Sequence, residues 1–230
     1  MQTIRINPDD DARIYETVGQ RINRELTDGK RVTWLVCGGS NIPLIVKAMD
    51  LVDPSLTNDL TIMLTDERFG VPGHADSNWT QLDDAGFQPH QASVIRTLQP
   101  ELTMEDTCNV YAQELLRATG EADIVIAHFG IGGDGHIAGI LPGTEASRMD
   151  GDGDPLVTGY DGGAFMRVTM TPKAWQLLDV AYACAFGDTK HQAIERLVSQ
   201  DIAIEDQPSQ LLKRLDEAYL FTDAPVHADI

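Results

Sequence analysis

The sequence has little positive charge. It carries 17 lysine and arginine residues against 36 aspartate and glutamate residues, which gives a formal net charge of -19 and a pI of about 4.4. Nucleic acids and anionic membrane surfaces need lysine and arginine to neutralise their phosphates, so we expect neither as a partner. The acidic residues are spread along the chain and indicate a strongly solvated surface, which a high-salt habitat would favour.

Cysteines are also scarce, and long apolar runs are absent. The three cysteines (Cys37, Cys108 and Cys184) are odd in number and show no zinc or redox spacing. Since two of them lie in apolar runs, we expect buried, reduced thiols. The N-terminal MQTIRINPDD lacks the apolar region of a signal peptide, and no run approaches about 18 apolar residues. These absences predict a protein of the cytoplasm.

The apolar residues make up 42% of the chain and occur in two patterns, helical spacing and near-continuous runs. Helical spacing, as at Ile14, Val18 and Ile22, predicts helices. They are expected at 9–28, 42–52, 77–87, 104–120, 135–141, 172–178, 188–200 and 208–215. Ser77 or Asn78 and Asp188 are candidate N-caps. Near-continuous apolar runs predict buried strands at 32–37, 60–68, 122–133, 166–171, 180–187 and 217–223.

This alternation of strand and helix predicts the fold class. Apolar runs of this kind are typical of parallel strands covered by helices on both faces. We therefore expect an α/β fold with three layers and a mostly parallel, Rossmann-like sheet, in a single domain over residues 1–230.

One long loop, residues 149–163, contains the pattern D-x-D-x-D. A calcium-binding EF-hand loop would need glycine at its sixth position and glutamate at its twelfth, where this chain has Pro155 and Asp161. We expect no calcium there and interpret the segment as a solvated, mobile loop.

Four polar clusters follow four of the expected strands. They are Gly38-Gly39-Ser40-Asn41, Asp66-Glu67-Arg68, Gly132-Gly133-Asp134-Gly135-His136 and Gly187-Asp188-Thr189-Lys190. Ligands of open parallel sheets bind beyond the carboxyl ends of the strands, so four such clusters should converge on one site. Each cluster taken alone could be an ordinary turn.

The first cluster and two cations predict a phosphate site. Backbone N–H groups of Gly38–Ser40, at the start of a helix, can bind an anion, and Asn41 belongs to the same turn. Lys190 lies in the first turn of its expected helix, where the helix dipole disfavours a cation, so a bound anion would explain it. Arg167 could add a bidentate contact. A plain turn is the alternative.

The segment Gly130–Gly135 matches the dinucleotide pattern G-x-G-x-x-G, but its context does not fit. The match lies in the middle of the chain, the helix expected after it is short, and the acidic residues that follow lie in the 150–154 loop, not after a strand. We therefore expect no nicotinamide cofactor, and we expect no other cofactor.

His136 is the candidate general base. At the start of a helix its imidazole would stay neutral and could accept a proton, with Asp134 orienting the ring or capping the helix. The alternative is a histidine packed against the sheet, which is the better interpretation of His128. The remaining histidines (His74, His90, His191 and His227) have no metal-ligand spacing, so we predict no metal.

Asp66 and Arg68 end a buried strand. A carboxylate and a guanidinium at this edge can position a substrate and stabilise an oxyanion, although a solvated exit turn would carry the same residues. No G-x-S-x-G occurs, so we expect water as the nucleophile of any hydrolysis.

Together these motifs resemble a known family. Gly-Gly-Ser-x-x-Pro, Asp-Glu-Arg followed by Ser77-Asn78, the segment Gly130–Gly143, Arg167 before a strand and Gly187-x-x-Lys190 are similar to the 6-phosphogluconolactonases, which share a superfamily with the glucosamine-6-phosphate deaminases. The resemblance covers roughly residues 10–222. It implies hydrolysis of 6-phosphogluconolactone, a step of the pentose phosphate pathway, with a small sugar phosphate as partner and with His136, Asp66, Arg68 and Asp134 at the catalytic centre.

Chemistry separates the two branches. Deaminases carry a glutamate where this chain has Leu141, and a tyrosine where it has Arg68, so the lactonase branch is the closer match. The chain departs from the usual lactonase pattern at Asn41 and at Gly139. An amino-sugar-phosphate deaminase or isomerase and a non-catalytic sugar-phosphate-binding protein remain the alternatives. We expect a monomer or a homodimer.

Overall fold

The computed structural model describes residues 1–7 and 10–227. Its strands are β1 (Gln2–Arg5), β2 (Val32–Val36), β3 (Leu60–Leu64), β4 (Asp66–Arg68), β5 (Ser93–Val94), β6 (Ile124–Gly130), β7 (Val157–Asp161), β8 (Met166–Met170), β9 (Val180–Ala185) and β10 (Glu217–Thr222). Its α-helices are α1 (Ala12–Thr27), α2 (Ile42–Asp50), α3 (Asn78–Asp84), α4 (Met104–Glu121) and α5 (Asp188–Ser199). Asp9, included in the first expected helix, lies outside the described residues.

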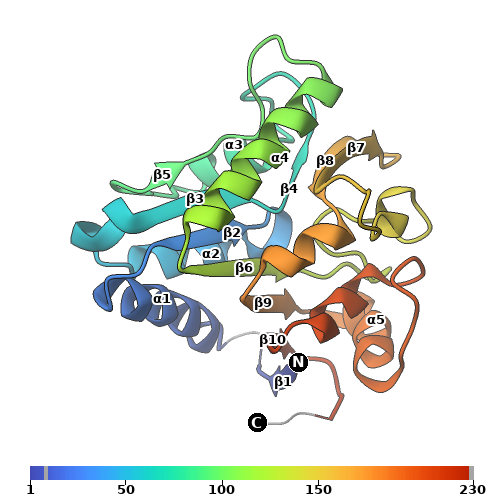
Figure 1. Cartoon of the computed structure of the whole chain (residues 1–230). Helices are drawn as coiled ribbons and strands as arrows, with labels where there is room; N and C mark the ends of the chain where they lie inside the picture. Colours follow the sequence, from blue (N-terminus) through green and yellow to red (C-terminus); the bar gives the residue numbers. More distant parts are fainter. Residues whose placement is uncertain (8–9, 228–230) are drawn as a thin grey trace.

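Seven strands form one parallel sheet in the order β1-β10-β9-β6-β2-β3-β5 (Figure 1). The central strands β2, β6 and β9 are almost completely buried, which explains why their sequences read as continuous apolar runs. The predicted α/β class with a mostly parallel sheet is confirmed.

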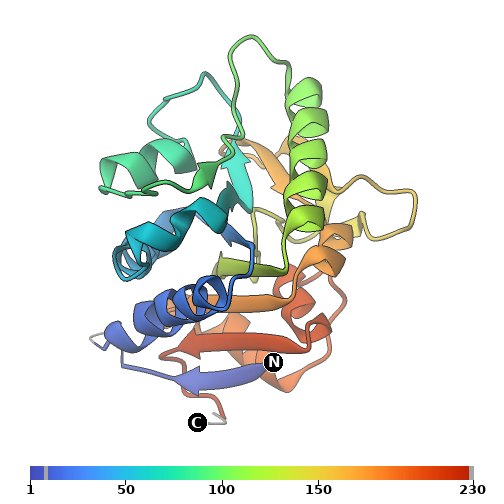
Figure 2. The ribbon, with the colours of Figure 1, turned by 60° about the vertical axis from the view of Figure 1, so that its left-hand side comes forward.

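Helices cover both faces of this sheet, as predicted. Alternate strand residues face opposite layers: Trp34 and Ile62 pack with residues of α1, α2 and α3, whereas Leu35 and Met63 pack with residues of α4 and α5. Figure 2 shows the layers with α1 and α2 on the left of the strands and α4 on the right. The result is the three-layer arrangement.

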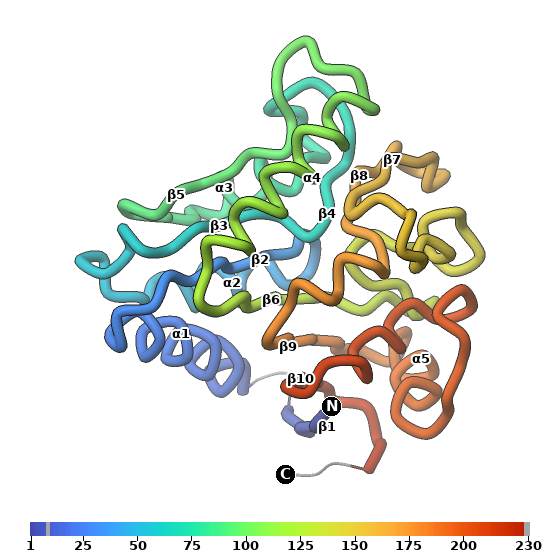
Figure 3. The backbone as a smooth tube through the Cα atoms, in the orientation of Figure 1, coloured from blue at the N-terminus to red at the C-terminus, as the bar shows by residue number. Residues whose placement is uncertain are grey.

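A second, antiparallel sheet was not predicted. It has the order β4-β8-β7, and β4 enters it directly after β3, through Thr65. The tube in Figure 3 shows β7 and β8 together at the upper right, beyond the large sheet. The small sheet is therefore tied to the carboxyl end of β3, at the edge where the polar clusters lie.

Several local predictions were wrong. Residues 135–141 form no helix, because Gly135, Ala138 and Gly139 adopt positive φ (+88°, +50° and +69°) and produce tight turns. The 149–163 segment contains β7 in its second half. Asp188 is the first residue of α5 and Gly187 is its N-cap, without a side-chain capping bond. The segments Pro172–Leu177 and Pro208–Arg214 are 3₁₀ helices.

Candidate active site

A cavity of about 290 Å³ lies where the large and small sheets meet. It receives residues from all four polar clusters and from β8, which are far apart in sequence. Its lining includes Gly38, Gly39, Ser40, Asp66, Arg68, Asn78, Gly132, His136, Gly139, Arg167 and Lys190. The fold thus brings eight of the ten predicted site residues to one cavity.

Ser40 and Lys190 form the end of the cavity that lies on the large sheet. The chain turns sharply at Gly39 (φ +71°) into the short 3₁₀ helix Gly39–Asn41, which leads into α2. Lys190 Nζ lies 3.4 Å from Ser40 Oγ, and burial lowers the pKa of this lysine. A hydroxyl and an ammonium group at a chain turn before a helix are suited to binding an anion.

Asn41 does not line the cavity. Its side chain is buried, and Nδ2 donates to the carbonyl oxygens of Phe129 (2.9 Å) and Cys184 (3.3 Å) at the ends of β6 and β9. The amide therefore holds neighbouring strand ends together. The sequence suggested Asn41 as a ligand-binding residue, whereas the structure places its Nδ2 on strand carbonyls and leaves the residue out of the cavity lining.

Asp66 and Arg68 lie on the same face of β4, because alternate strand residues share a face. Asp66 is almost fully buried, and its Oδ2 is 4.0 Å from Nη1 of Arg167 on β8. A Cβ at Gly139 would lie 2.7 Å from Asp66 Oδ2, so only glycine leaves room for the carboxylate. This close approach gives Gly139, a departure from the usual family pattern, a structural explanation.

His136 and Asp134 form a hydrogen-bonded pair at the bend that follows β6. The His136 ring Nδ1 is 2.7 Å from Asp134 Oδ1, which also accepts the His136 backbone N–H at 3.0 Å. Burial alone would raise the pKa of Asp134, but these hydrogen bonds lower it to about 2, so the carboxylate is ionised at neutral pH. An ionised acceptor favours the tautomer with the proton on Nδ1, which leaves the Nε2 lone pair free.

The helix-dipole argument for His136 was therefore wrong, because no helix begins at this residue. Its orientation comes instead from Asp134 and from the bend, which packs tightly against its surroundings. Ser209 N–H donates to the carbonyl of Gly135 (3.0 Å), and a Cβ at Gly133 would lie 2.6 Å from the carbonyl oxygen of Thr189. The side chain of His136 is 35% exposed, so the ring is open to water.

Cys37 also lines the cavity, but it is not suited to act as a nucleophile. Burial raises its pKa to about 12, so the thiol stays protonated at neutral pH. His128, predicted to be a core residue, is fully buried, and burial lowers its pKa to about 4. Neither group competes with His136 as an acid–base residue.

Asn78 and Glu67 are site residues that the sequence analysis did not place. Asn78 lines the cavity, donates from Nδ2 to the carbonyl of Asp66 (2.8 Å), and lies so close to Gly38 that a Cβ there would be 1.8 Å from Oδ1. Glu67 faces the other way and is fully buried. Its carboxylate accepts hydrogen bonds from Arg68 N, Ser77 Oγ, Asn78 N and Trp79 N. Glu67 thereby fixes the start of α3, and with it Asn78.

We expect Glu67→Gln to destabilise the fold by about 1–3 kcal/mol, because two of the four donors lose their acceptor. Thermal or urea unfolding measures this change. Glu16→Gln, on the exposed face of α1, is the matched control and should change stability by no more than about 0.5 kcal/mol. Equal stability of the two variants would show that the Glu67 contacts contribute little.

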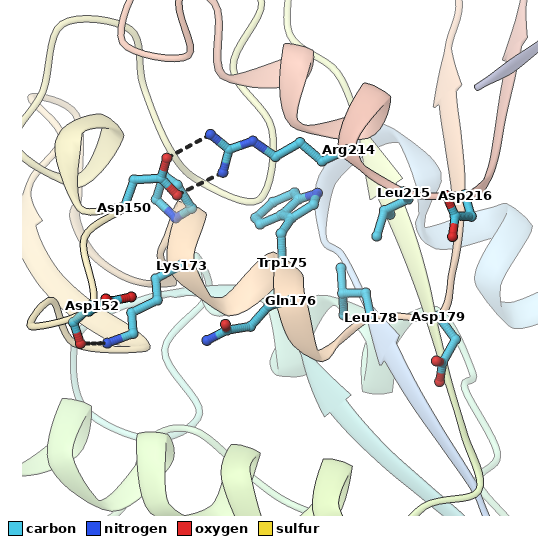
Figure 4. Close-up of a pocket in the computed structure, with 11 residues that line it drawn as sticks. Asp150, Asp152, Lys173, Trp175, Gln176, Leu178, Asp179, Arg214, Leu215 and Asp216 are labelled. Atoms are coloured by element: carbon cyan, nitrogen blue, oxygen red, sulfur yellow. Dashed lines mark hydrogen bonds and ion pairs between the residues drawn. The ribbon is translucent and has the colours of Figure 1, made fainter.

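A second cavity, of about 450 Å³, lies at the opposite, amino-terminal edge of β9 and β10 (Figure 4). Two cations hold the acidic segment beside it. Arg214 forms two hydrogen bonds with Asp150, and Lys173 Nζ donates to the carbonyls of Asp152 and Asp154. The lysine ammonium thus links the carbonyls of this acidic segment to the 3₁₀ helix Pro172–Leu177.

The described part of the chain contains no cluster of three or more histidine, cysteine, aspartate or glutamate side chains that could hold a metal ion. Within residues 1–7 and 10–227, none of the helices has the length and apolar character needed to cross a bilayer.

Comparison with known proteins identifies the family. The model of the glucosamine-6-phosphate isomerases/6-phosphogluconolactonase family matches residues 10–220. The chain belongs to this family. Among curated members, a 6-phosphogluconolactonase of Thermotoga maritima is 26% identical over 171 residues, which are 70% of this chain and 72% of the relative.

Solved structures of family members share the fold. A 6-phosphogluconolactonase from Shewanella baltica superposes with a TM-score of 0.80 at 18% identity, covering 96% of this chain and 97% of the other. The Thermotoga maritima enzyme gives 0.78 at 20% identity, covering 96% and 98%. A monomeric glucosamine-6-phosphate deaminase gives 0.77 at 17% identity, covering 96% and 97%. Both branches of the family therefore have this architecture, and fold alone does not separate them.

Proposed function

We propose that the protein hydrolyses 6-phospho-D-glucono-1,5-lactone to 6-phospho-D-gluconate, using a water molecule activated by His136. The observation that carries this proposal is the side chain at position 141. Deaminases have a proton-transferring glutamate there, whereas Leu141 is apolar and packs against the hydrophobic core. Leucine cannot assist ring opening of an amino sugar, but the attack of water on a lactone does not require an acid at this position.

The residues that line the cavity suggest how the substrate would be held. Backbone N–H groups near Gly39, together with Ser40, Lys190 and Arg167, would hold the phosphate group. The lactone carbonyl would then lie toward His136 and Arg68, which line the same cavity. Asp66 would keep Arg167 in place through their contact.

His136 would act through Nε2. Asp134 holds the proton on Nδ1, so Nε2 can accept a proton from water as that water attacks the lactone carbonyl. Arg68 would stabilise the negative charge that develops on the carbonyl oxygen. Cleavage of the ring C–O bond, with return of the proton from His136 to the leaving oxygen, yields a hydroxyl group and a carboxylic acid, which releases its proton to solvent and becomes the carboxylate.

We also infer that the reaction takes place in the cytoplasm. Cys37, Cys108 and Cys184 are all buried and unpaired, whereas oxidising compartments favour disulfides. Every residue with a proposed role belongs to one chain, so a monomer and a homodimer would both contain complete sites.

The direct test measures lactone hydrolysis and ammonia release side by side. We expect hydrolysis of 6-phosphogluconolactone above its spontaneous rate, and no ammonia from glucosamine 6-phosphate. Ammonia release would support the deaminase alternative instead. Tight binding of both sugar phosphates without turnover of either would indicate a non-catalytic binding protein.

A further inference from the structure

Two arginines oppose each other at the site. In the antiparallel pairing of β4 and β8, Arg68 is directly opposite Arg167, and both side chains line the cavity. Residues paired in this way share one face of the sheet, with Cβ atoms about 4.5–5.5 Å apart, and like charges in such a pair repel each other. Without an anionic ligand, neighbouring groups of the protein must reduce the repulsion between the two guanidinium groups.

Carboxylates reduce the repulsion between Arg68 and Arg167 only in part. Asp66 lies at 4.0 Å from Arg167, at the limit of an ion pair. Arg68 forms no ion pair with any described residue, and its Nη1 donates to the backbone carbonyl of Asp76 at 2.7 Å. The Nε atom of each arginine is buried and has no hydrogen-bond partner in the described chain.

Phe165 contacts both guanidinium groups. Its ring centroid is 5.3 Å from Cζ of Arg68 and 5.9 Å from Cζ of Arg167, within the range of a cation–π interaction. Phe165 is not among the residues that line the cavity. The ring therefore supports the arginines without lying in the cavity itself.

Phe165 belongs to the turn between β7 and β8, two strands that lie side by side in Figure 1. Gly162 N–H donates to the carbonyl of Phe165 (2.9 Å), and Gly163 adopts a φ of +84°. A Cβ at Gly162 would lie 2.6 Å from Nε of Arg167, so the turn packs directly against this guanidinium. Only glycine allows this approach.

We propose that Phe165 is a positioning residue for the anionic substrate. Its π face stabilises two like-charged guanidinium groups side by side, so that both are ordered before the phosphorylated ligand binds. Ordering in advance reduces the entropy lost on binding. The proposal rests on the proposed function in assigning the two arginines to a phosphorylated substrate.

The test compares Phe165→Leu, which removes the aromatic face, with Phe165→Tyr, which keeps it. We expect Phe165→Leu to weaken binding of 6-phosphogluconate, measured by calorimetry, by about 5- to 30-fold, and Phe165→Tyr to bind as the wild type does. Met166→Ala, a change at an exposed side chain of the same hairpin, is the matched control and should leave binding unchanged. A purely structural role would lower the melting temperature without changing the dissociation constant of folded protein.

A double-mutant cycle tests whether the effect of Phe165 on binding depends on the two arginines. In an Arg68→Met, Arg167→Met background, Phe165→Leu should have no further effect on 6-phosphogluconate binding, because the cations that the ring supports are gone. If Phe165→Leu does not fold, Phe165→Met replaces it in the same comparison. Equal affinities of the wild type and the folded aliphatic variant would overturn the proposal. Absence of lactone hydrolysis by the wild type would instead contradict the proposed function, and it would be seen in a separate assay.

Discussion

Replacing His136 with alanine should lower kcat for lactone hydrolysis by about 100- to 10,000-fold, the usual contribution of a general base. The expected loss follows from the geometry at the bend after β6. Asp134 Oδ1 is hydrogen-bonded to Nδ1, and the ring, whose side chain is partly exposed, lines the cavity. Steady-state kinetics, corrected for spontaneous opening of the lactone, measures the change.

Binding should survive in the same variant, because the groups proposed to hold the phosphate do not include His136. Calorimetry with 6-phosphogluconate should give a dissociation constant close to that of the wild type. Asp134→Asn should also reduce kcat, since the ring would lose the acceptor that fixes its tautomer. His227→Ala, at an exposed position, is the control. An unchanged kcat in His136→Ala would remove this residue from the mechanism.

Arg68→Ala is expected to lower kcat by about 100- to 1,000-fold, as the loss of an oxyanion donor commonly does. The guanidinium lines the cavity, and Phe165 and the carbonyl of Asp76 hold it in position. Arg68→Lys should retain part of the activity, because it keeps the charge and loses the planar donor geometry. Initial rates over a range of lactone concentrations separate kcat from KM.

The matched control for this variant is Arg96→Ala. Arg96 also stacks on an aromatic ring, that of Trp79, and pairs with Asp83, but it lies outside the cavity lining. Its replacement should leave both kinetic constants unchanged. A rise in KM at constant kcat in Arg68→Ala would show that Arg68 binds the phosphate group rather than the developing oxyanion.

The sequence predicted the large sheet well because its strands are buried on both sides. Val32–Val36 and Val180–Ala185 are short, almost continuous apolar runs, the pattern expected of strands buried on both faces. Ser77 was one of two candidate N-caps, with Asn78, and its Oγ accepts the Thr80 N–H. The strand β1 was missed because only four residues pair with β10.

The small sheet and the bend at His136 depend on tertiary contacts that sequence patterns do not report. Residues Val157–Asp161 include a glycine and a threonine, and they form a strand because Met166–Met170 lies beside them. Residues 135–141 contain helix-compatible apolar residues, yet Tyr160 Oη donates to the carbonyl of Gly139 and accepts the Leu141 N–H, which stabilises turns instead. Asn41 was misplaced for the same reason, since nothing local indicates which way its amide points.

The pairing of β1 with β10 has a consequence for handling the protein. Gln2–Arg5 cover a six-residue strand whose N–H and C=O groups would otherwise be free to pair with another molecule. Shortening the chain past Arg5 would replace this four-residue edge strand by the six-residue β10 as the edge of the sheet, and longer exposed edges promote association into aggregates. Affinity tags that are cleaved close to the start of the sequence should therefore leave these few residues intact.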